Sequence, residues 1–419
     1  DILIWPLMIA LFYYDSHLPP IESLINNLEQ LAQFSLGYWL ELAERYISMA
    51  MIAWLVVAWI AFLYFKNIFR MGSLALLAII FTGVYSHVSE PAGPMVALKP
   101  IAEKSQTGTR AESPEMFIND FYQRQDEWLV NAPKINAEAS GAFDILLVNI
   151  CSISWEDIKA VGLENHSVFS KFDIILDNYN SVSSYSGPSA LRILQASCGQ
   201  KPHQQIYQPS RQCLLADDLT RLGFKPELFM NHDGEFDNFK SSLLNSGGIK
   251  TYKDIQRSLS PTMIAFDGAA IFDDKQVIDG WLAQKEQDQA RFGFYNSLTL
   301  HDGNRKLNSN QTSLQSYKER ALLMFEQIAA LIDQAERQER KLLLIVVPEH
   351  GAGLKGDGVQ LAGLREIPTY PLTHVPVMLK LIGAGYSNSK PIRVEKQTNQ
   401  NAISSLIMNV LAQQPFSGG

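Results

Sequence analysis

The chain has 419 residues, of which 47% are hydrophobic and 19% are charged, enough for one large folded domain with additional segments. Its net charge of −8, without a basic tail, argues against nucleic acid as a partner. With three cysteines, the chain is not a disulfide-dense scaffold.

Residues 1–90 are predicted to form a membrane region. The runs 47–65 and 71–88 contain no Asp, Glu, Lys or Arg, and each is long enough to span the hydrocarbon core of a bilayer. Residues 2–14 are apolar but too short for a full span, and we interpret them as the end of a helix that begins before this sequence. From about residue 20 to 45, apolar residues recur at helical spacing, which predicts an interfacial helix on the outer face of the membrane. A soluble helical hairpin is the alternative interpretation of this region.

The charges around these runs predict their orientation. Lys66 and Arg70 lie between the two runs, whereas acidic residues precede the first one. Because positive charge marks cytoplasmic loops, everything beyond residue 90 is predicted to lie outside the cytoplasm. Residues 91–112 are polar and contain several prolines, which is typical of a linker. The remainder, 113–415, is then a separate domain.

The domain over 113–415 is predicted to have an α/β fold, because apolar strand-like runs alternate with amphipathic helical segments. Such alternation favours a largely parallel sheet with helices on both sides. The predicted strands are 144–150, 172–176, 228–231, 263–266, 292–299, 342–348 and 375–381, and the predicted helices are 116–129, 155–161, 189–196, 215–222, 274–286, 316–338 and 401–412.

The strongest chemical signal lies at the ends of two predicted strands. Glu349 and His350 directly follow the apolar run 342–348, and Cys151 directly follows the run 144–150. In open α/β sheets, ligands collect at the carboxyl ends of the strands. Thiolate, carboxylate and imidazole ligands together make up most of a zinc site. The alternative is that Glu349 and His350 are ordinary loop residues.

Ser186 is the candidate nucleophile. Pro188 suits a first helical turn and Gly187 permits close backbone approach, so Ser186 is predicted to lie at a helix N-terminus. The free N–H groups there favour a phosphate or oxyanion. Beside zinc, the hydroxyl would become a nucleophile near neutral pH. The alternative role of such a serine is that of a simple N-cap.

Two further residues are predicted near the same site. His301 follows the strand 292–299 and could bind metal, protonate a leaving group, or be satisfied by a backbone carbonyl. Arg365 lies among apolar neighbours and could clamp a phosphate or pair with an acid. His203 and His374 are weaker candidates.

The cysteines and one capping pair give two structural predictions. Cys198 and Cys213 lie fifteen positions apart and could close a disulfide in an oxidising compartment, the alternative being two buried thiols. The predicted location outside the cytoplasm favours the disulfide. Ser154 and Asp157 resemble a capping pair for the helix that follows Cys151.

Six motifs in this order resemble those of the bacterial cellulose phosphoethanolamine transferases, which are inner-membrane enzymes with a periplasmic domain of the alkaline phosphatase and sulfatase superfamily. The resemblance extends from the membrane region to about residue 412. The motifs are Asn149-Ile150-Cys151-Ser152-Ile153-Ser154-Trp155, Ser184-Tyr185-Ser186-Gly187-Pro188, Ala196-Ser197-Cys198-Gly199-Gln200, Leu300-His301-Asp302-Gly303-Asn304, Val347-Pro348-Glu349-His350-Gly351 and Gly363-Leu364-Arg365-Glu366-Ile367-Pro368.

This resemblance implies transmembrane helices followed by an α/β/α sandwich with a central, mostly parallel sheet. It implies transfer of phosphoethanolamine from phosphatidylethanolamine to glucose 6-hydroxyls of cellulose, with Ser186 as the nucleophile and His301 and Arg365 around the substrate phosphate. It also implies the inner membrane and cellulose synthase subunits as partners. The implied zinc ligands are Cys151, Ser186, Glu349 and His350.

The sequence departs from the wider pattern at a few positions. Many superfamily members have Asp in place of Cys151 and Thr in place of Ser186. The resemblance therefore implies that the Cys151 and Ser186 pair marks the cellulose-directed branch. His374 stands where an acidic residue is expected, and the chain is shorter than the family pattern at both ends. Two other functions stay open: the same chemistry on lipid A or another glycan, and a non-catalytic membrane scaffold of a cellulose synthase complex.

Overall fold

The computed structural model describes residues 28–46, 49–65, 81, 113–130, 143–284, 289–385 and 390–416. The chain divides into two compact units. One combines Asp1–Tyr38 with Ile118–Gly419, and the other is Trp39–Phe117.

The smaller unit contains α5 (Met49–Phe65), a helix of 17 residues without a single charged side chain. Most of its large apolar side chains are exposed. Within the described ranges, we find no helix that combines the length and the apolar character needed to cross a membrane. The predicted span 71–88, apart from Phe81, the partial span 2–14 and the linker 91–112 all lie outside the described residues. The membrane segments and domain boundaries stay predictions.

The described part of the interfacial helix predicted over 20–45 is divided. From residue 28 onward the structure has two helices, α3 (Leu28–Ala32) and α4 (Leu36–Tyr46). They are separated where the backbone N–H of Ser35 donates to the carbonyl of Phe266 at 2.9 Å. A tertiary contact therefore overrides the continuous helical spacing of the sequence.

The larger unit is built on a sheet of eight strands, all parallel to their neighbours except β10, which runs antiparallel to both β9 and β2. The predicted largely parallel sheet is thus confirmed. A second, small sheet has the order β6 (Ala270–Ile271), β5 (Met263–Ile264), β8 (Arg305–Lys306). The order of the large sheet is β11 (Ile392–Val394), β2 (Ile174–Asn180), β10 (His374–Ile382), β9 (Leu342–Pro348), β1 (Asp144–Ile150), β7 (Arg291–Ser297), β3 (Lys225–Met230), β4 (Thr251–Tyr252).

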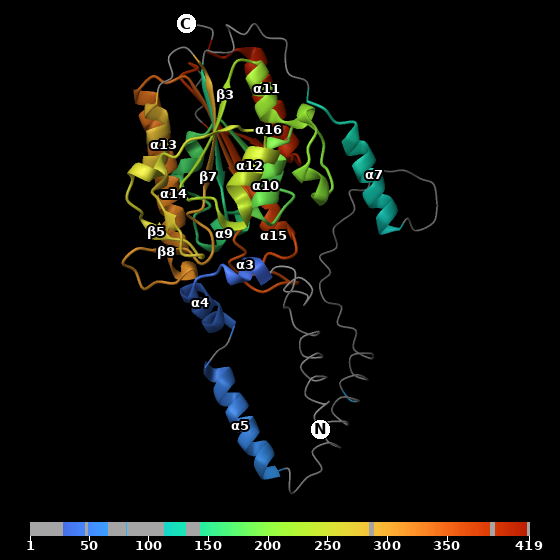
Figure 1. Ribbon diagram of the computed structural model, residues 1–419, viewed down its shortest axis with the longest axis vertical. Helices are drawn as coiled ribbons and strands as arrows, with labels where there is room; N and C mark the ends of the chain where they lie inside the picture. Colours follow the sequence, from blue (N-terminus) through green and yellow to red (C-terminus); the bar gives the residue numbers. More distant parts are fainter. Residues whose placement is uncertain are drawn as a thin grey trace. The chain divides into compact units, whose positions relative to one another are not determined.

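Helices cover both faces of the large sheet (Figure 1). On β1, Leu147 packs into one apolar cluster and Leu146 into the other, so successive side chains serve opposite faces. All seven residues of β9 are buried, which explains its continuous apolar sequence. One face carries α10 (Ser186–Leu194), α11 (Leu215–Arg221), α12 (Phe239–Ser246) and α16 (Gln400–Gln413), and the other carries α9 (Trp155–Ala160), α13 (Asp274–Ala283) and α14 (Ser313–Arg337).

Several shorter elements connect these layers. The predicted strand 263–266 is corrected to the two-residue β5 of the small sheet, and the strand predicted at 172–176 is β2, which continues to Asn180 against β10. The helix α12 and the two-residue strands β4, β6 and β8 were too short or too polar to predict. The remaining elements are α7 (Pro114–Asp126), α15 (Tyr370–Thr373) and the 3-10 helices η1 (Ser167–Lys171), η2 (His203–Tyr207), η3 (Arg211–Cys213), η4 (Phe236–Asn238) and η5 (Gln256–Ser258).

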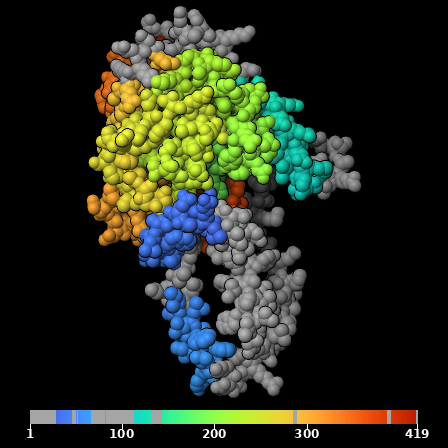
Figure 2. All heavy atoms as spheres, in the orientation of Figure 1, coloured from blue at the N-terminus to red at the C-terminus, as the bar shows by residue number. Residues whose placement is uncertain are grey.

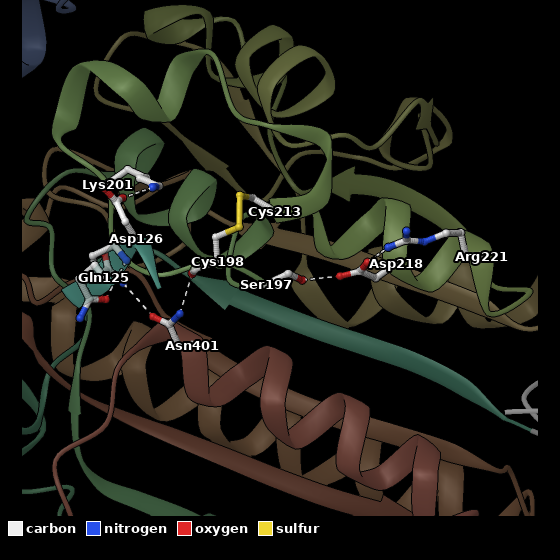
Figure 3. The surroundings of a disulfide bond; sticks show 10 residues. Gln125, Asp126, Ser197, Cys198, Lys201, Cys213, Asp218, Arg221 and Asn401 are labelled. Atoms are coloured by element: carbon white, nitrogen blue, oxygen red, sulfur yellow. Dashed lines mark hydrogen bonds and ion pairs between the residues drawn. A yellow bond between two sulfur atoms is a disulfide. The ribbon is translucent and has the colours of Figure 1, made fainter. Parts of the chain in front are cut away.

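The predicted disulfide between Cys198 and Cys213 is confirmed (Figure 3). It joins the segment after α10 to η3, just before α11. The segment is also held by Asn401 of α16, whose side-chain amide donates to the carbonyl of Cys198 at 2.6 Å. The hydroxyl of Ser197 donates to Asp218 of α11 at 2.5 Å. The cross-link thus ties η3 to the segment that follows α10.

Candidate active site

Cys151, Glu349 and His350 lie together at the carboxyl ends of two adjacent strands. In the register of β1 and β9, Ile150 is opposite Pro348, so the residues that follow each strand are neighbours. One ligand atom from each of the three side chains lies within 4.8 Å of the other two, and all three residues are fully buried. The sheet register therefore assembles the cluster that the two sequence motifs predicted.

Ser186 joins this cluster from the first turn of α10. Its Oγ lies 3.2 Å from the Sγ of Cys151 and 3.2 Å from the Nε2 of His350. The N-cap is Tyr185, which supplies no side-chain hydrogen bond to the helix. The predicted position of Ser186 at a helix N-terminus is confirmed, and the alternative role as N-cap is wrong. The first-turn N–H groups are left for an anionic ligand.

Backbone contacts orient the imidazole of His350. Its Nδ1 lies 2.8 Å from the carbonyl oxygen of Gly351, to which it donates, and this directs Nε2 at Cys151 and Ser186. A side chain at Gly351 would place its Cβ 2.7 Å from the Oγ of Ser154, so only glycine fits. Burial, followed by the nearby charge of Arg365, lowers the pKa of His350 well below its usual range. The ring is thus neutral, the form that binds metal.

The carboxylate of Glu349 is only half satisfied. Its Oε1 accepts a hydrogen bond of 2.6 Å from Asn296, whereas its buried Oε2 has no hydrogen-bond partner within the described part of the chain. Burial raises the pKa of Glu349 and raises the pKa of the Cys151 thiol to about 12. A cation here would offset the cost of burying these anions. An orphaned carboxylate oxygen beside a thiol, an imidazole nitrogen and a hydroxyl fits zinc.

Asp157 anchors the loop that carries the cluster. Its carboxylate accepts hydrogen bonds from the backbone N–H groups of Ala352 at 2.6 Å and Leu354 at 3.2 Å. It also forms the predicted capping box with Ser154, which is confirmed. One buried carboxylate therefore fixes both the start of α9 after Cys151 and the turn after His350.

Arg365 and His301 lie beside the same cluster. The Nη2 of Arg365 is 3.1 Å from the Nε2 of His301, and its Nη1 is 3.2 Å from the Oγ of Ser152 and 3.4 Å from both ring nitrogens of His350. The Nδ1 of His301 donates to the carbonyl of Asp302 at 2.6 Å, as one of the sequence alternatives expected. Burial, with Arg365, lowers the pKa of His301 to about 3, so this ring is a neutral acceptor for the guanidinium.

A cavity of about 620 Å³ opens over these groups. It combines a polar end at Ser186, His301 and Arg365 with several Phe and Tyr side chains, the composition expected of a small-molecule site. The lining also includes Gln30, Leu31, Phe34, Tyr38, Tyr185, Gly187, His203, Phe236, Asp237, Phe266, Asn296 and Glu366.

The two weaker histidine candidates have different positions. His203 lines the cavity, with its ring 5.6 Å from that of Tyr207. His374 begins β10, where its Nε2 donates to the carbonyl of Asp177 at 2.7 Å and its ring stacks on Tyr370. Neither belongs to the cluster of Cys151, Glu349 and His350.

Several residues of the site were not predicted. Asn296 of β7 links Glu349 to Asn149 of β1, donating to the Oδ1 of Asn149 at 2.9 Å. Ser152 adopts a left-handed conformation with φ of 65°, an uncommon and strained geometry that turns the chain directly after Cys151. An amide side chain near the carboxyl end of each of two buried strands was the available signal for Asn149 and Asn296.

Comparison with known proteins identifies relatives of the whole chain. The family model "Cellulose biosynthesis protein BcsG N-terminal domain" matches residues 1–84, and "Cellulose biosynthesis protein BcsG C-terminal domain" matches residues 100–419. The cellulose biosynthesis protein BcsG of Escherichia coli K12 is 34% identical over 445 residues, which covers 98% of this chain and 78% of that protein.

Two solved structures are similar in fold. One is a protein in the alkaline phosphatase superfamily from Vibrio parahaemolyticus, with a TM-score of 0.51 and 11% identity, covering 72% of this chain and 76% of that one. The other is the C-terminal periplasmic domain of EcEptC from Escherichia coli, with a TM-score of 0.50 and 12% identity, covering 68% and 86%. The expected alkaline-phosphatase-like α/β fold is therefore confirmed.

Proposed function

The chain belongs to the BcsG family of cellulose biosynthesis proteins, and from this premise we propose that it transfers phosphoethanolamine from phosphatidylethanolamine to glucose 6-hydroxyls of cellulose. One observation carries the proposal. The hydroxyl of Ser186 lies at a helix N-terminus, 3.2 Å from both the thiol and the imidazole of a buried three-residue cluster. This arrangement can activate a serine and bind a phosphate at the same point.

Zinc is the metal that the donor set favours. Cys151, Ser186, Glu349 and His350 would hold it, with the orphaned Oε2 of Glu349 as the carboxylate ligand. When bound, zinc lowers the pKa of a coordinated hydroxyl and stabilises negative charge on phosphate oxygens. Asn296 and Gly351 orient Glu349 and His350, respectively, for this role.

In the first half-reaction, the Oγ of Ser186 attacks the phosphorus of phosphatidylethanolamine. A bond forms between Oγ and phosphorus, the bond from phosphorus to the diacylglycerol oxygen breaks, and the serine proton ends on the released diacylglycerol. Arg365 is assigned to the phosphate oxygens, and the neutral ring of His301 orients its guanidinium. The first-turn N–H groups of α10 add hydrogen bonds to the same oxygens.

In the second half-reaction, a glucose 6-hydroxyl attacks the phosphorus of the phosphoserine intermediate. A new oxygen–phosphorus bond forms, the Oγ of Ser186 leaves, and the proton of the sugar hydroxyl returns to the serine. Both half-reactions use the same serine, so the kinetics are expected to be ping-pong.

Glu366 is the carboxylate that we assign to the ammonium group of the substrate. It lines the cavity and accepts a hydrogen bond of 2.8 Å from the hydroxyl of Tyr185, the residue before the nucleophile. Burial and the neighbouring carboxylate both raise the pKa of Tyr185, so its hydroxyl stays a donor. A carboxylate within a cavity attracts the positive end of phosphoethanolamine while Arg365 binds the negative one.

The protein is proposed to act at the outer face of a bacterial inner membrane as a multi-pass protein, with residues 113–415 in the periplasm. Two observations support this location. The helix α5 is apolar on all sides, and the disulfide Cys198–Cys213 suits an oxidising compartment. Cellulose and subunits of a cellulose synthase complex are the proposed partners, since the family is one of cellulose biosynthesis proteins.

The test is intact-protein mass after incubation with phosphatidylethanolamine and no acceptor. Wild type should gain one phosphoethanolamine, mapped to the peptide that contains Ser186. Addition of cellulose oligosaccharides should remove the adduct, whereas removal only by lipid A would favour that acceptor. No adduct in a zinc-loaded protein would leave the non-catalytic scaffold as the better interpretation.

A further inference from the structure

The active-site cavity contains residues from a distant part of the chain. Gln30, Leu31, Phe34 and Tyr38 line it, although they precede the catalytic residues by more than a hundred positions and belong to the N-terminal domain of the family. We propose that the segment Leu28–Tyr38 is a positioning element of the active site, which holds the turn of His301 in place through Tyr38 and Phe266. This inference rests on the proposed function only for its kinetic test.

Within the larger unit, the segment is held against residues far along the chain by polar contacts along its length. The side chain of Gln30 donates to Asp237 at 2.9 Å, the N–H of Ser35 donates to the carbonyl of Phe266 at 2.9 Å, and the guanidinium of Arg305 donates to the carbonyl of Gly37. In Figure 2, the darkest blue spheres, which belong to the larger unit, are in contact with the yellow surface of the same unit. These bonds fix the place of the segment as well as its conformation.

An aromatic cluster, defined as Phe34, Tyr38, Phe236 and Phe266, joins the segment to the catalytic residues. The ring of Phe34 lies 5.0 Å from that of Tyr38, 5.7 Å from Phe266 and 6.3 Å from Phe236. The ring of Phe266 in turn stacks on the imidazole of His301 at 4.3 Å. Contacts of this kind stabilise one relative orientation of the rings. His301 therefore has a packed neighbour whose position depends on Phe34 and Tyr38.

Tyr38 also reaches the turn of His301 directly. Its hydroxyl donates to the carboxylate of Asp302 at 3.0 Å, and the backbone carbonyl of Asp302 accepts from His301. Gly303 has a φ of +81°, and a Cβ there would lie 2.6 Å from Phe266 and 2.7 Å from the ring of Tyr38. The turn is thus packed between the two rings with no room to shift toward either.

This packing has a consequence for the phosphate site. Because the Nε2 of His301 accepts from Arg365 at 3.1 Å, a displacement of the turn changes the orientation of the guanidinium. Tyr38 is therefore a positioning residue that acts through His301 on Arg365. It differs from an ordinary packing residue because its effect on the reaction must disappear when His301 is absent.

The test uses the full chain with its metal and measures the rate at which Ser186 gains phosphoethanolamine. Tyr38→Phe removes one hydrogen bond and should slow the rate by about three- to tenfold. In the His301→Ala background, the same substitution should have no further effect, because the double-mutant cycle isolates the coupling. Zinc content should be unchanged. Equal effects of Tyr38→Phe in both backgrounds would overturn the proposal.

A second measurement does not depend on transfer activity. Carbethoxylation of His301 by diethyl pyrocarbonate, followed by peptide mapping, reports how freely the turn moves. Tyr38→Phe and Phe34→Leu should each raise the rate of modification several-fold. Tyr252→Phe, which removes a tyrosine hydroxyl bonded to Gln256 and outside the cavity lining, should not. If wild type forms no adduct on Ser186 but both variants show the raised rate of His301 modification, the proposed function fails and the positioning element stands. If the rate of His301 modification in both variants equals that of wild type, the positioning proposal is overturned.

Discussion

The strand-end cluster (Cys151, Ser186, Glu349 and His350) and the aromatic cluster (Phe34, Tyr38, Phe236 and Phe266) both serve the cavity, but they are assembled differently. Three members of the strand-end cluster, Cys151, Glu349 and His350, directly follow two adjacent strands. The pairing of β1 with β9 is therefore enough to bring them together. The aromatic cluster has no shared element and is held by ring packing between three segments. Backbone register thus positions the proposed metal ligands, and side-chain packing positions the aromatic residues around the cavity.

The two kinds of construction should fail in different ways. An apolar side chain of similar shape cannot replace a metal ligand, because it has no donor atom. Packed rings, in contrast, tolerate replacements of similar volume with a modest loss of stability. Substitutions in the strand-end cluster should therefore markedly weaken zinc binding or abolish transfer, and those in the aromatic cluster should only slow transfer.

The largest expected effect is that of Ser186→Ala. This change removes the nucleophile, so transfer should fall by at least about 10³-fold, and no phosphoethanolamine should appear on the protein. The fold should persist, because Ser186 does not provide the helix cap. Intact mass and circular dichroism measure the two outcomes. Ser241→Ala, on the exposed start of α12, is the matched control. Retained transfer, or an adduct on another residue, would contradict the mechanism.

Removal of a metal ligand is next in size. Wild type should bind about one zinc per chain, and Cys151→Ala or His350→Ala should weaken that binding markedly because a four-ligand site loses one ligand. Dialysis against a chelator should likewise stop transfer. Elemental analysis is the measurement, and His374→Ala, whose ring bonds to the backbone of Asp177, should keep its zinc. Full zinc occupancy in both ligand variants would rule out this ligand set.

A smaller effect should separate the ligands from the residues that orient them. Asn296→Ala leaves the carboxylate of Glu349 in place but without its hydrogen bond of 2.6 Å. Zinc affinity should fall by about 10- to 100-fold, as is typical of such supporting residues. Competition with a fluorescent chelator gives the affinity. Asn178→Ala, at the exposed side of β2, is the control, and equal affinities for both variants would show that Asn296 does not orient Glu349.

The contrast between the clusters also explains what the sequence could predict. The buried strands 144–150 and 342–348 were predicted with their observed bounds, because their unbroken apolar runs leave little choice of structure. Their parallel pairing then brings Cys151 and Glu349 together. The disulfide and the position of Ser186 followed from similarly short-range signals.

The aromatic cluster could not be predicted in this way. Nothing near Phe34 or Tyr38 in the sequence indicates that they contact Asp302 or Phe266, because those contacts depend on packing over more than two hundred positions. The backbone hydrogen bond from Ser35 to Phe266 likewise interrupts the helix expected over 20–45. Helical periodicity predicts an apolar face but does not identify the residues that pack against it.

Glu366→Gln should act on binding more than on chemistry. Loss of the negative charge should raise the KM for phosphatidylethanolamine by about tenfold, a typical value for one weakened charged contact, with a smaller change in kcat. The zinc content should not change, since Glu366 is outside the strand-end cluster. A phosphatidylglycerol donor, which lacks the ammonium group, should show no such loss. An unchanged KM would remove Glu366 from ammonium recognition.

The smallest effect on the site is expected from the disulfide. In the double variant Cys198→Ser and Cys213→Ser, the unfolded chain regains the freedom of a loop of about fifteen residues, which lowers the free energy of unfolding by roughly 3 kcal/mol in the chain-entropy model. Denaturant unfolding of the membrane-extracted protein measures this loss. In the folded variant, the segment after α10 keeps the hydrogen bond from Asn401 to the backbone carbonyl of position 198 and that from Ser197 to Asp218. The helix α10 should therefore stay in place. Zinc content, kcat and KM well below the unfolding temperature should match those of wild type. A changed kcat would mean that the position of Ser186 depends on the cross-link as well as on the sheet, and that the strand-end cluster is less self-sufficient than its register indicates.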